Sequence, residues 1–287
     1  MVVKEYDDVR AFLNDYEKVL LEQEAISQLV LYNAYQCRDH AIDEKAIFGA
    51  VEYEGKAVVL FSYVTKFNLV IFAALPENAV PASAALADYL GARHILINYI
   101  NARHDVCLSF IEQYRKQINC SFSEKLGMEI MEIREVNEIK PMEGMHRLAL
   151  IEEAKLVTEW MIEFQMEALT SEMDYEAALN RAKKLIEEKK IYFYENTDHQ
   201  VVSMAVASRK LVHGTAITYV YTPEEYRGIG YAAANIYYLS KELLLQGNEF
   251  CTLFVDKKNP LSGRAYEKVG YKTIEENYEY KLNPIEV

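Results

Sequence analysis

An arginine and two glycines stand where a predicted strand gives way to a predicted helix. The stretch is YVYTPEEYRGIGYAAAN at 219–235, with Arg227, Gly228 and Gly230 between a proline turn and an alanine-rich segment. A helix N-terminus presents unpaired backbone N–H groups and the positive end of the helix dipole, which attract anions. Glycines let a phosphate approach the backbone closely, and an arginine adds charge-assisted hydrogen bonds. The pattern predicts a pyrophosphate site, with an ordinary glycine-containing turn as the alternative.

Two common nucleotide-binding patterns do not fit this stretch. A P-loop requires Lys-Ser or Lys-Thr after its second glycine, whereas Tyr231-Ala232 follow here. The dinucleotide pattern requires a third glycine after Gly230, and that glycine is missing.

The stretch resembles the acetyl-CoA signature of the GNAT N-acetyltransferase superfamily, [RQ]-x-x-G-x-[GA], because residues 227–232 read RGIGYA. A second block, LFVDKKNPLSGRAYEKVGY at 253–271, is similar to the family's later conserved region, in which a strand ends in Asn-Pro and a helix carries a tyrosine. The resemblance covers about 146–285 of this sequence and, as a worn copy, 1–133.

The resemblance assigns roles to the matching residues. It implies acetyl-CoA as co-substrate and no metal. The end of the strand before the loop would pair its backbone with the pantetheine arm, the loop N–H groups would hold the pyrophosphate, Asn259 would bond the pantetheine, and Lys268 would approach the nucleotide end. Tyr266 stands where the family often has a general acid for the departing thiolate, although a tyrosine that packs on the sheet is the alternative. The full cofactor-binding set is Val220, Tyr221, Thr222, Arg227, Gly228, Ile229, Gly230, Tyr231, Ala232, Asn259 and Lys268.

Two carboxylates are candidates for the general base. Transfer to an amine requires a group that takes a proton from it. Glu163 and Glu167 lie one turn apart on a predicted helix that, by the resemblance, borders the acceptor cleft. Solvated surface glutamates are the alternative for both. His199 and His213 fall in predicted loops, where we expect surface residues.

The element pattern that positions these residues is α/β. Helical spacing between 7 and 35 precedes strands at 57–64 and 68–75, a helix at 81–90, a strand at 94–99, a helix at 102–116 and a strand at 128–133. A predicted linker at 134–145 contains Pro141 and Gly144. From 147 on, two helices are followed by strands at 191–195, 201–208 and 214–221, a helix at 228–245, a strand at 251–255, a helix at 262–269 and strands at 271–274 and 277–282. This pattern predicts an α/β fold, and the resemblance implies tandem GNAT-like domains, each a mixed central sheet flanked by helices.

The two halves are related by an internal repeat. EKLGMEI at 124–130 parallels EKVGYKT at 267–273, and LPENAVPASAALADYL at 75–90 parallels TPEEYRGIGYAAANIYYL at 222–239. Val80, Pro81 and Ser83 then stand where the second half has Arg227, Gly228 and Gly230. We predict a degenerate domain at 1–133 without a cofactor loop, a linker at 134–145, and a catalytic domain at 146–287.

Composition narrows the class of protein and its partners. The 287 residues carry a formal net charge of −13, which disfavours nucleic acid and anionic membranes and tolerates a cationic small molecule. No apolar run is long enough to span a membrane, and the acidic start does not fit a signal peptide, so a cytoplasmic protein is expected. Cys37, Cys107, Cys120 and Cys251 lack metal-site spacing and are expected to be buried thiols. Homo-oligomerisation is left open.

The sequence predicts an acetyl-CoA-dependent N-acetyltransferase that transfers the acetyl group directly to the primary amine of a small acceptor. No Cys or Ser near the motif has a partnered base that would indicate a covalent intermediate. The alternative is a non-catalytic acyl-CoA-binding regulatory module. A third reading, a tRNA-dependent aminoacyl- or peptidyl-transferring relative, is disfavoured by the acidic charge and the intact loop.

Overall fold

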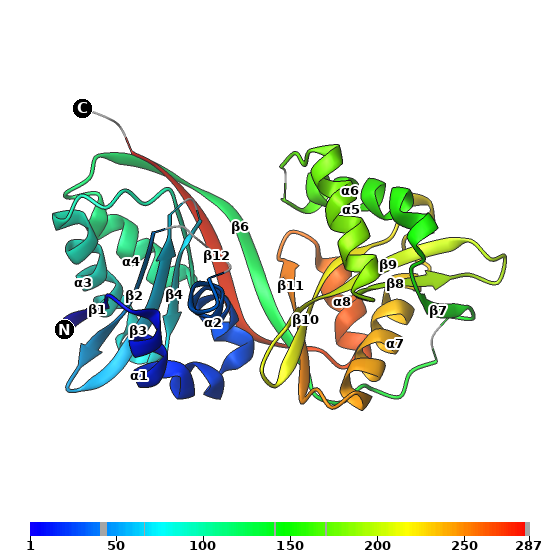
Figure 1. Ribbon diagram of the computed structural model, residues 1–287, viewed down its shortest axis with the longest axis horizontal. Helices are drawn as coiled ribbons and strands as arrows, with labels where there is room; N and C mark the ends of the chain where they lie inside the picture. Colours follow the sequence, from blue (N-terminus) through cyan, green and yellow to red (C-terminus); the bar gives the residue numbers. More distant parts are fainter. Residues whose placement is uncertain (41–44, 66, 141, 170, 285–287) are drawn as a thin grey trace. The chain divides into compact units, whose positions relative to one another are not determined.

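The chain divides into two compact units in the computed structural model, which describes residues 1–40, 45–65, 67–140, 142–169 and 171–284. Unit 1 comprises Met1–Glu129 together with the described residues from Glu275 on, and unit 2 comprises Ile130–Ile274. Each unit is a sheet with helices on both faces (Figure 1). The expected mixed α/β fold with helix-flanked sheets is confirmed.

Five strands from the N-terminal part of the chain form one side of the sheet of unit 1. The last strand of the chain pairs with the fifth of them and so extends this sheet. Glu54 and Gly55 form the tight turn between its second and third strands, with φ of 50° and 75°, values that suit a two-residue hairpin. The strand order is β1-β2-β3-β4-β5-β12-β6. Its elements are β1 Val2–Tyr6, α1 Val9–Glu22, α2 Glu24–Arg38, β2 Ala46–Tyr53, β3 Lys56–Val64, β4 Leu69–Ala73, the 3-10 helix η1 Pro76–Asn78, α3 Ala79–Ala92, β5 Tyr99–Ala102, α4 His104–Tyr114 and β6 Cys120–Ile133.

Unit 2 repeats the same order of elements, as the internal repeat predicts. Its strand order is β6-β11-β10-β9-β8-β7. Its elements are β7 Met145–Leu148, η2 Ile151–Glu153, α5 Ala154–Leu169, α6 Tyr175–Glu187, β8 Ile191–Glu195, β9 Val201–Lys210, β10 Gly214–Tyr221, η3 Glu224–Tyr226, α7 Tyr231–Leu245, β11 Phe250–Asp256, α8 Pro260–Val269 and β12 Lys272–Pro284. The two units therefore share one topology.

The structural units differ from the boundaries predicted at 133 and 146. Strand β12 begins in unit 2, but from Glu275 on it belongs to unit 1, where it lies between β5 and β6. Its register against β5 runs from Tyr278↔Ala102 to Lys281↔Tyr99. Residues 130–145, predicted as the end of the first domain and a linker, belong to unit 2. The cause is long-range strand pairing, which local sequence patterns do not contain. Pro141 lies outside the described residues.

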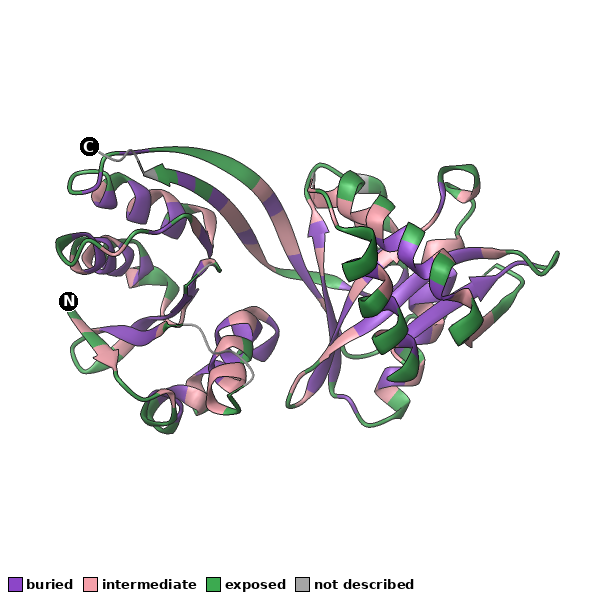
Figure 2. Ribbon diagram, turned by 45° about the horizontal axis from the view of Figure 1, so that its top comes forward, coloured by how far each residue is buried: buried purple, intermediate pink, exposed green. Residues whose placement is uncertain are grey.

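Apolar clusters hold the helices on the sheets. In unit 1, α3 and α4 pack on one face and α1 and α2 on the other. In unit 2, α7 and α8 pack on one face and α5 and α6 on the other. Figure 2 shows the helices buried on the side that meets their sheet and exposed on the outer side. Cys107, Cys120 and Cys251 are buried as expected, whereas Cys37 is only half-buried.

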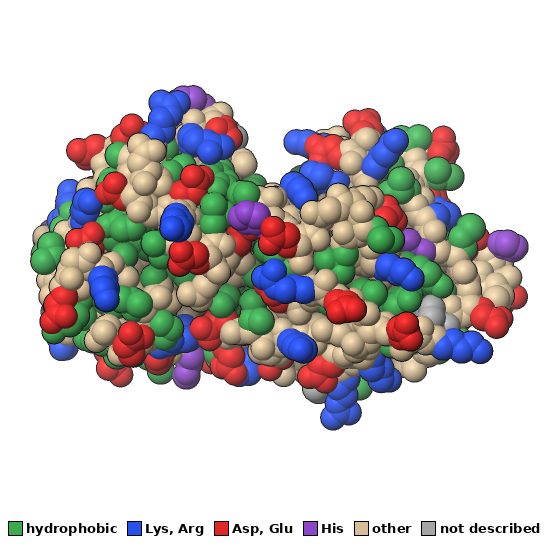
Figure 3. All heavy atoms as spheres, turned by 90° about the horizontal axis from the view of Figure 1, so that it is seen from below, with side chains coloured by type: hydrophobic (Ala, Val, Ile, Leu, Met, Phe, Trp, Pro, Cys, Tyr) green, Lys and Arg blue, Asp and Glu red, His purple; other side chains and the backbone are tan. Residues whose placement is uncertain are grey.

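Charged side chains of both signs alternate on the surface drawn in Figure 3. On that face, lysines and arginines of the described chain lie among acidic side chains and do not merge into one basic surface. Within the described ranges, no helix has both the length and the apolar character needed to cross a membrane.

Candidate active site

A bulge bends β10 just before the predicted cofactor loop. Tyr219 has φ of 49°, a left-handed backbone conformation that is uncommon for a tyrosine. The β9–β10 register shifts between Thr218 and Tyr221 at the same place. The Tyr219 ring packs on Phe164 of α5 at 5.1 Å between centroids, and the Arg181 guanidinium lies 5.4 Å from that ring. Contacts with α5 and α6 thus hold the bulge in place. A bulge of this kind changes the direction of the strand.

Strands β10 and β11 separate after Ala216 and Thr252, before β10 reaches the bulge. Their parallel ladder has three pairs, from Gly214↔Phe250 to Ala216↔Thr252, although β10 continues to Tyr221 and β11 to Asp256. Thr218 and Thr222 each have a buried Oγ1 with no hydrogen-bond partner among the described residues. Buried hydroxyls are normally paired, so each of these orphaned ones indicates a ligand or ordered water beside it. The divergence leaves backbone on β10 that an extended amide-bearing chain can pair with.

The glycines of the loop adopt backbone conformations that favour glycine. Gly228 has φ of 77° and Gly230 has φ of 117°. Gly230 is the N-cap of α7 and no side chain caps the helix there. The first N–H groups of this 15-residue helix therefore lack a side-chain acceptor at the loop, as an anion site requires. A methyl group added at Gly228 would meet nothing within 4 Å, whereas one at Gly230 would touch Met142 Cγ at 3.4 Å.

Arg227 does not extend from the loop but folds back towards α5. Its Nε donates to the Thr222 carbonyl at 2.8 Å and its Nη2 donates to Glu167 Oε2 at 2.7 Å. The guanidinium therefore ties the loop to both the end of β10 and the helix that carries the candidate bases. The predicted pyrophosphate contact is left to the backbone N–H groups in this conformation.

Both candidate bases lie beside Tyr221. The Tyr221 hydroxyl donates to Glu167 at 3.5 Å. Burial raises the pKa of Tyr221, and so do a hydrogen bond with Glu163 and the charge of Glu167. Glu167 is half-exposed and paired with Arg227, while Glu163 is exposed. These contacts join α5 to the end of β10. Of the two carboxylates, Glu167 is the one that forms an ion pair with Arg227.

Tyr266 is buried on the sheet side of α8. Its side chain is 6% exposed, its ring lies 6.1 Å from that of Tyr271, and it interacts with the Ser262 hydroxyl one turn earlier. Burial raises the pKa of Tyr266 well above that of a free phenol. The hydroxyl therefore keeps its proton at neutral pH, and it is a weaker proton donor than a free phenol.

The remaining predicted residues lie on β10, in the loop, at the start of α7 and at the two ends of α8. Asn259 is the N-cap of α8, and its Oδ1 accepts from the Ser262 N–H at 3.3 Å, so its amide donors remain for a ligand. Lys268 is exposed in the last turn of α8, about 13 Å along the helix from Asn259. The structure does not bring these two together. Tyr231 and Ala232 open α7, Ile229 is exposed in the loop, and Val220 is half-buried on β10.

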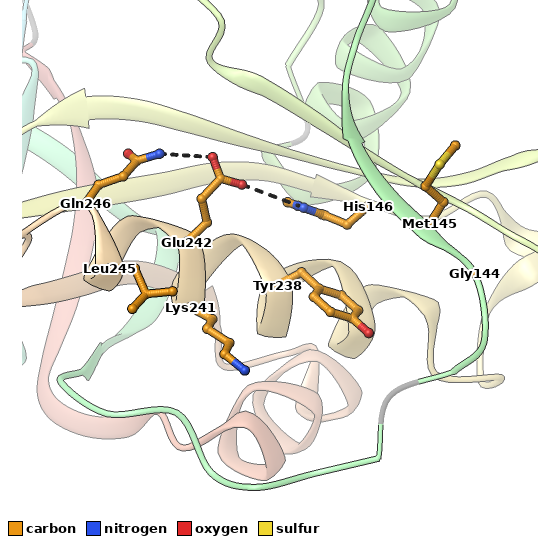
Figure 4. A pocket seen from close by; sticks show the side chains of 8 residues that line it. All are labelled: Gly144, Met145, His146, Tyr238, Lys241, Glu242, Leu245 and Gln246. Carbon is orange, nitrogen blue, oxygen red and sulfur yellow. Dashed lines mark hydrogen bonds and ion pairs between the residues drawn. The ribbon is translucent and has the colours of Figure 1, made fainter.

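A separate hollow lies on the second half of α7. It has a volume of about 530 Å³ and is lined by residues of α7 and by Gly144, Met145 and His146 (Figure 4). The His146 ring stacks between Tyr192 and Tyr238 at 5.1 and 5.8 Å, and its Nδ1 lies 3.9 Å from Glu242 Oε2. Burial lowers the pKa of His146 to about 4, so the ring is neutral. None of the predicted site residues lines this hollow.

Over the part of the chain that the structure describes, no three His, Cys, Asp or Glu residues gather as metal ligands would. His199, predicted as a surface residue, is exposed and its Nδ1 lies 3.1 Å from Glu195 Oε1.

Sequence reasoning missed four contributors to this site. They are the bulge at Tyr219, the orphaned Thr218 hydroxyl, the Met142 contact with Gly230 and the Ser262 partner of Tyr266. Only the spacing of Ser262, four residues before Tyr266 on one helix face, was readable in advance.

The chain is similar to known acetyltransferases in its sequence pattern and in its fold. The acetyltransferase (GNAT) family model matches residues 154–271, which run from α5 to just beyond α8. A GCN5-related N-acetyltransferase from Sphaerobacter thermophilus has a TM-score of 0.62 at 13% identity, with 100% of this chain and 97% of that one covered. A Drosophila protein also has a TM-score of 0.62 at 13% identity, with 99% of each chain covered. A GNAT-family acetyltransferase from Colwellia psychrerythraea has a TM-score of 0.55 at 11% identity, with 99% of this chain and 100% of that one covered. At such identities the likeness shows the fold. No curated protein matches the sequence.

Proposed function

We propose that the chain transfers the acetyl group of acetyl-CoA directly to the primary amine of a small acceptor, a proposal supported by the match of the acetyltransferase (GNAT) family model to residues 154–271. One observation carries this proposal. The divergence of β10 from β11 leads straight into a loop whose two glycines have φ of 77° and 117°, at an uncapped helix N-terminus. A slot for an extended arm and a site for a pyrophosphate thus adjoin one another.

The residues at the divergence fit acetyl-CoA, which supplies an acyl group activated as a thioester. The backbone of Val220 and Thr222 would pair with the pantetheine amides, and the orphaned Thr222 hydroxyl offers a further partner. The N–H groups from Gly228 to Ala232 would hold the pyrophosphate against the positive end of α7. Asn259 would donate its amide hydrogens to the arm from the N-cap of α8, because its oxygen is already used in the cap.

Proton transfer would be divided between Glu163 and Tyr266. The acceptor enters as an ammonium ion and must lose a proton before its nitrogen can attack the thioester carbonyl. Glu163 suits this task better than Glu167, since Arg227 binds Glu167 at 2.7 Å and stabilises its charged form. When the C–S bond breaks, Tyr266 would donate its proton to the thiolate and regain one from the solvent.

The acceptor class follows from charge. Glu163 and Glu167 present two carboxylates one turn apart on the exposed side of α5, and the chain as a whole carries a formal charge of −13. These features favour a cationic amine over an anionic or nucleic-acid acceptor.

The experiment is a screen of small amines, polyamines and aminoglycosides for release of free CoA from acetyl-CoA. With an accepted amine, Glu163→Gln should lower turnover and shift its pH dependence, and Glu167→Gln should change both less. Tyr266→Phe should lower turnover without changing the affinity for acetyl-CoA. Tyr271→Phe, which removes the neighbouring buried hydroxyl bonded to Ser240, is the matched control. Full turnover by Tyr266→Phe would refute the general-acid role of Tyr266, whereas binding of acetyl-CoA without CoA release for any amine would argue for the alternative, a non-catalytic acyl-CoA-binding module.

A further inference from the structure

The segment that leads into β7 lies against the loop to which the proposed function assigns the pyrophosphate. Residues 142–144 precede β7, which is the last strand of the unit 2 sheet and pairs with β8. Met142 Cγ lies 3.4 Å from the point that a Cβ on Gly230 would occupy. Gly230 is the N-cap of α7. Met142 therefore touches the helix N-terminus whose N–H groups would hold the phosphates.

One buried hydroxyl holds this segment in place. Tyr194 of β8 is fully buried, and its hydroxyl donates a hydrogen bond to the Met142 carbonyl. Burial raises the pKa of Tyr194 to about 12, so the hydroxyl keeps its proton and remains a donor at neutral pH. A side chain at Gly144 would collide with the Tyr194 ring and with the Glu195 carbonyl, so the segment lies directly on β8.

The ring of Tyr194 belongs to the aromatic cluster that supports both ends of the loop. Tyr226 and Tyr231 pack against this cluster. The ring centroids of Tyr194 and Tyr231 are 6.2 Å apart, and those of Tyr231 and Tyr226 are 6.4 Å apart. Tyr226 ends η3 and Tyr231 opens α7, so these two residues flank the loop at 227–230. The ring thus supports the loop from the sheet, while the hydroxyl holds Met142 beside it.

A second tyrosine on the same strand offers an internal comparison. Tyr192 lies two residues before Tyr194, so both side chains point to the face of the sheet that α7 covers. Tyr192 is also buried, but its hydroxyl donates to Glu242 at 3.1 Å, in the second half of α7. The two hydroxyls are alike in burial and bonding, and only that of Tyr194 bonds to the segment beside the loop.

We propose that Tyr194 is a positioning residue for the acetyl-CoA site. Its hydroxyl holds Met142 against Gly230 and so fixes the N-terminus of α7 in the shape that receives the pyrophosphate. Tyr194 acts through Met142 and does not touch the cofactor or the reacting atoms. This inference rests on the proposed function, because it concerns the loop to which that function assigns the pyrophosphate.

The test compares Tyr194→Phe with Tyr192→Phe in the full chain. Each variant loses one hydroxyl hydrogen bond at a buried ring, so both should lower the Tm by similar amounts. In isothermal titration, only Tyr194→Phe should raise the dissociation constant of acetyl-CoA, by about fivefold, as expected for one hydrogen bond. With an accepted amine, its kcat should stay unchanged while its KM for acetyl-CoA rises. In the ligand-free chain, Tyr194→Phe should speed hydrogen exchange in peptides covering 226–236, and Tyr192→Phe should not.

Met142→Ala tests the route and stays informative if Tyr194→Phe does not fold. It should weaken acetyl-CoA binding by a similar factor. Adding Tyr194→Phe to it should weaken binding little further, because residues that act through one another are not additive. Met145→Ala is the matched control, since Met145 is another exposed methionine of the same segment but lines the hollow on the second half of α7. It should leave the affinity unchanged.

Equal affinities of the two phenylalanine variants for acetyl-CoA would overturn the proposal. Losses from Tyr194→Phe and Met142→Ala that multiply in the double variant would overturn it too, as would unchanged exchange at 226–236 in Tyr194→Phe. A wild-type chain that binds no acetyl-CoA would refute the proposed function. The exchange measurement needs no ligand, so it would show separately whether Tyr194 holds the loop.

Discussion

Gly228 allows the loss of cofactor binding to be separated from the loss of stability. At φ of 77°, the left-handed conformation destabilises the folded state of an alanine variant by about 1–2 kcal/mol. The alanine also lowers the conformational entropy of the unfolded chain, which offsets about 0.4–1 kcal/mol of this loss. A methyl group there meets no atom within 4 Å, so no clash adds to this. Gly228→Ala should therefore lower the free energy of unfolding by about 1 kcal/mol.

Gly247 provides the matched control. It has φ of 94°, is exposed, and also has nothing within 4 Å of an added methyl group, but it follows the C-terminal end of α7, away from the loop. Gly247→Ala should cost the same stability in urea unfolding. Only the Gly228 methyl group stands in the proposed pyrophosphate site, so we expect only Gly228→Ala to weaken acetyl-CoA binding in calorimetry, by roughly tenfold or more, which is about 1.4 kcal/mol. Equal affinities in the two variants would refute the assignment of the loop.

Three further predictions test neighbouring features. Tyr266→Phe should cut turnover while leaving the dissociation constant of acetyl-CoA unchanged, and a matching fall in affinity would indicate a packing role instead. Glu167→Gln breaks a half-exposed pair with Arg227, so urea unfolding should show a loss below about 1 kcal/mol, and a larger loss would mean that the pair holds the loop. Burial lowers the pKa of His146 from 6.5 to about 4, so the unfolded chain binds the proton more tightly and stability falls as the pH drops from 6.5 towards 4. The full loss is up to about 3 kcal/mol, and His146→Phe should flatten this part of the pH profile; an unchanged profile would mean that other groups cause it.

The sequence predicted the local elements of the site well, because its signals are local. The strand ending at Tyr221, the proline turn and the loop at 227–230 appear where the pattern placed them, although α7 begins at Tyr231 and not at 228. The reason is that Gly228 and Gly230 have left-handed backbones that a helix cannot contain.

Features that depend on distant partners could not be predicted. The strand expected at 94–99 is instead β5 at Tyr99–Ala102, because the Tyr114 hydroxyl satisfies the backbone of Ile95 and Ile97. The two final strands expected at 271–274 and 277–282 are one strand, β12, which leaves unit 2 to complete unit 1. The contact of Arg227 with Glu167 spans 60 residues, and no spacing rule indicates it.

The most direct test of the central claim is the stoichiometry of acetyl-CoA binding by isothermal titration of the full chain. One intact loop per chain predicts one acetyl-CoA per chain in the wild type. Gly230→Glu, which places a carboxylate at the N-cap of α7, should abolish this binding while the circular dichroism spectrum stays that of the folded protein. Two molecules bound per chain, or unchanged binding by Gly230→Glu, would contradict the account.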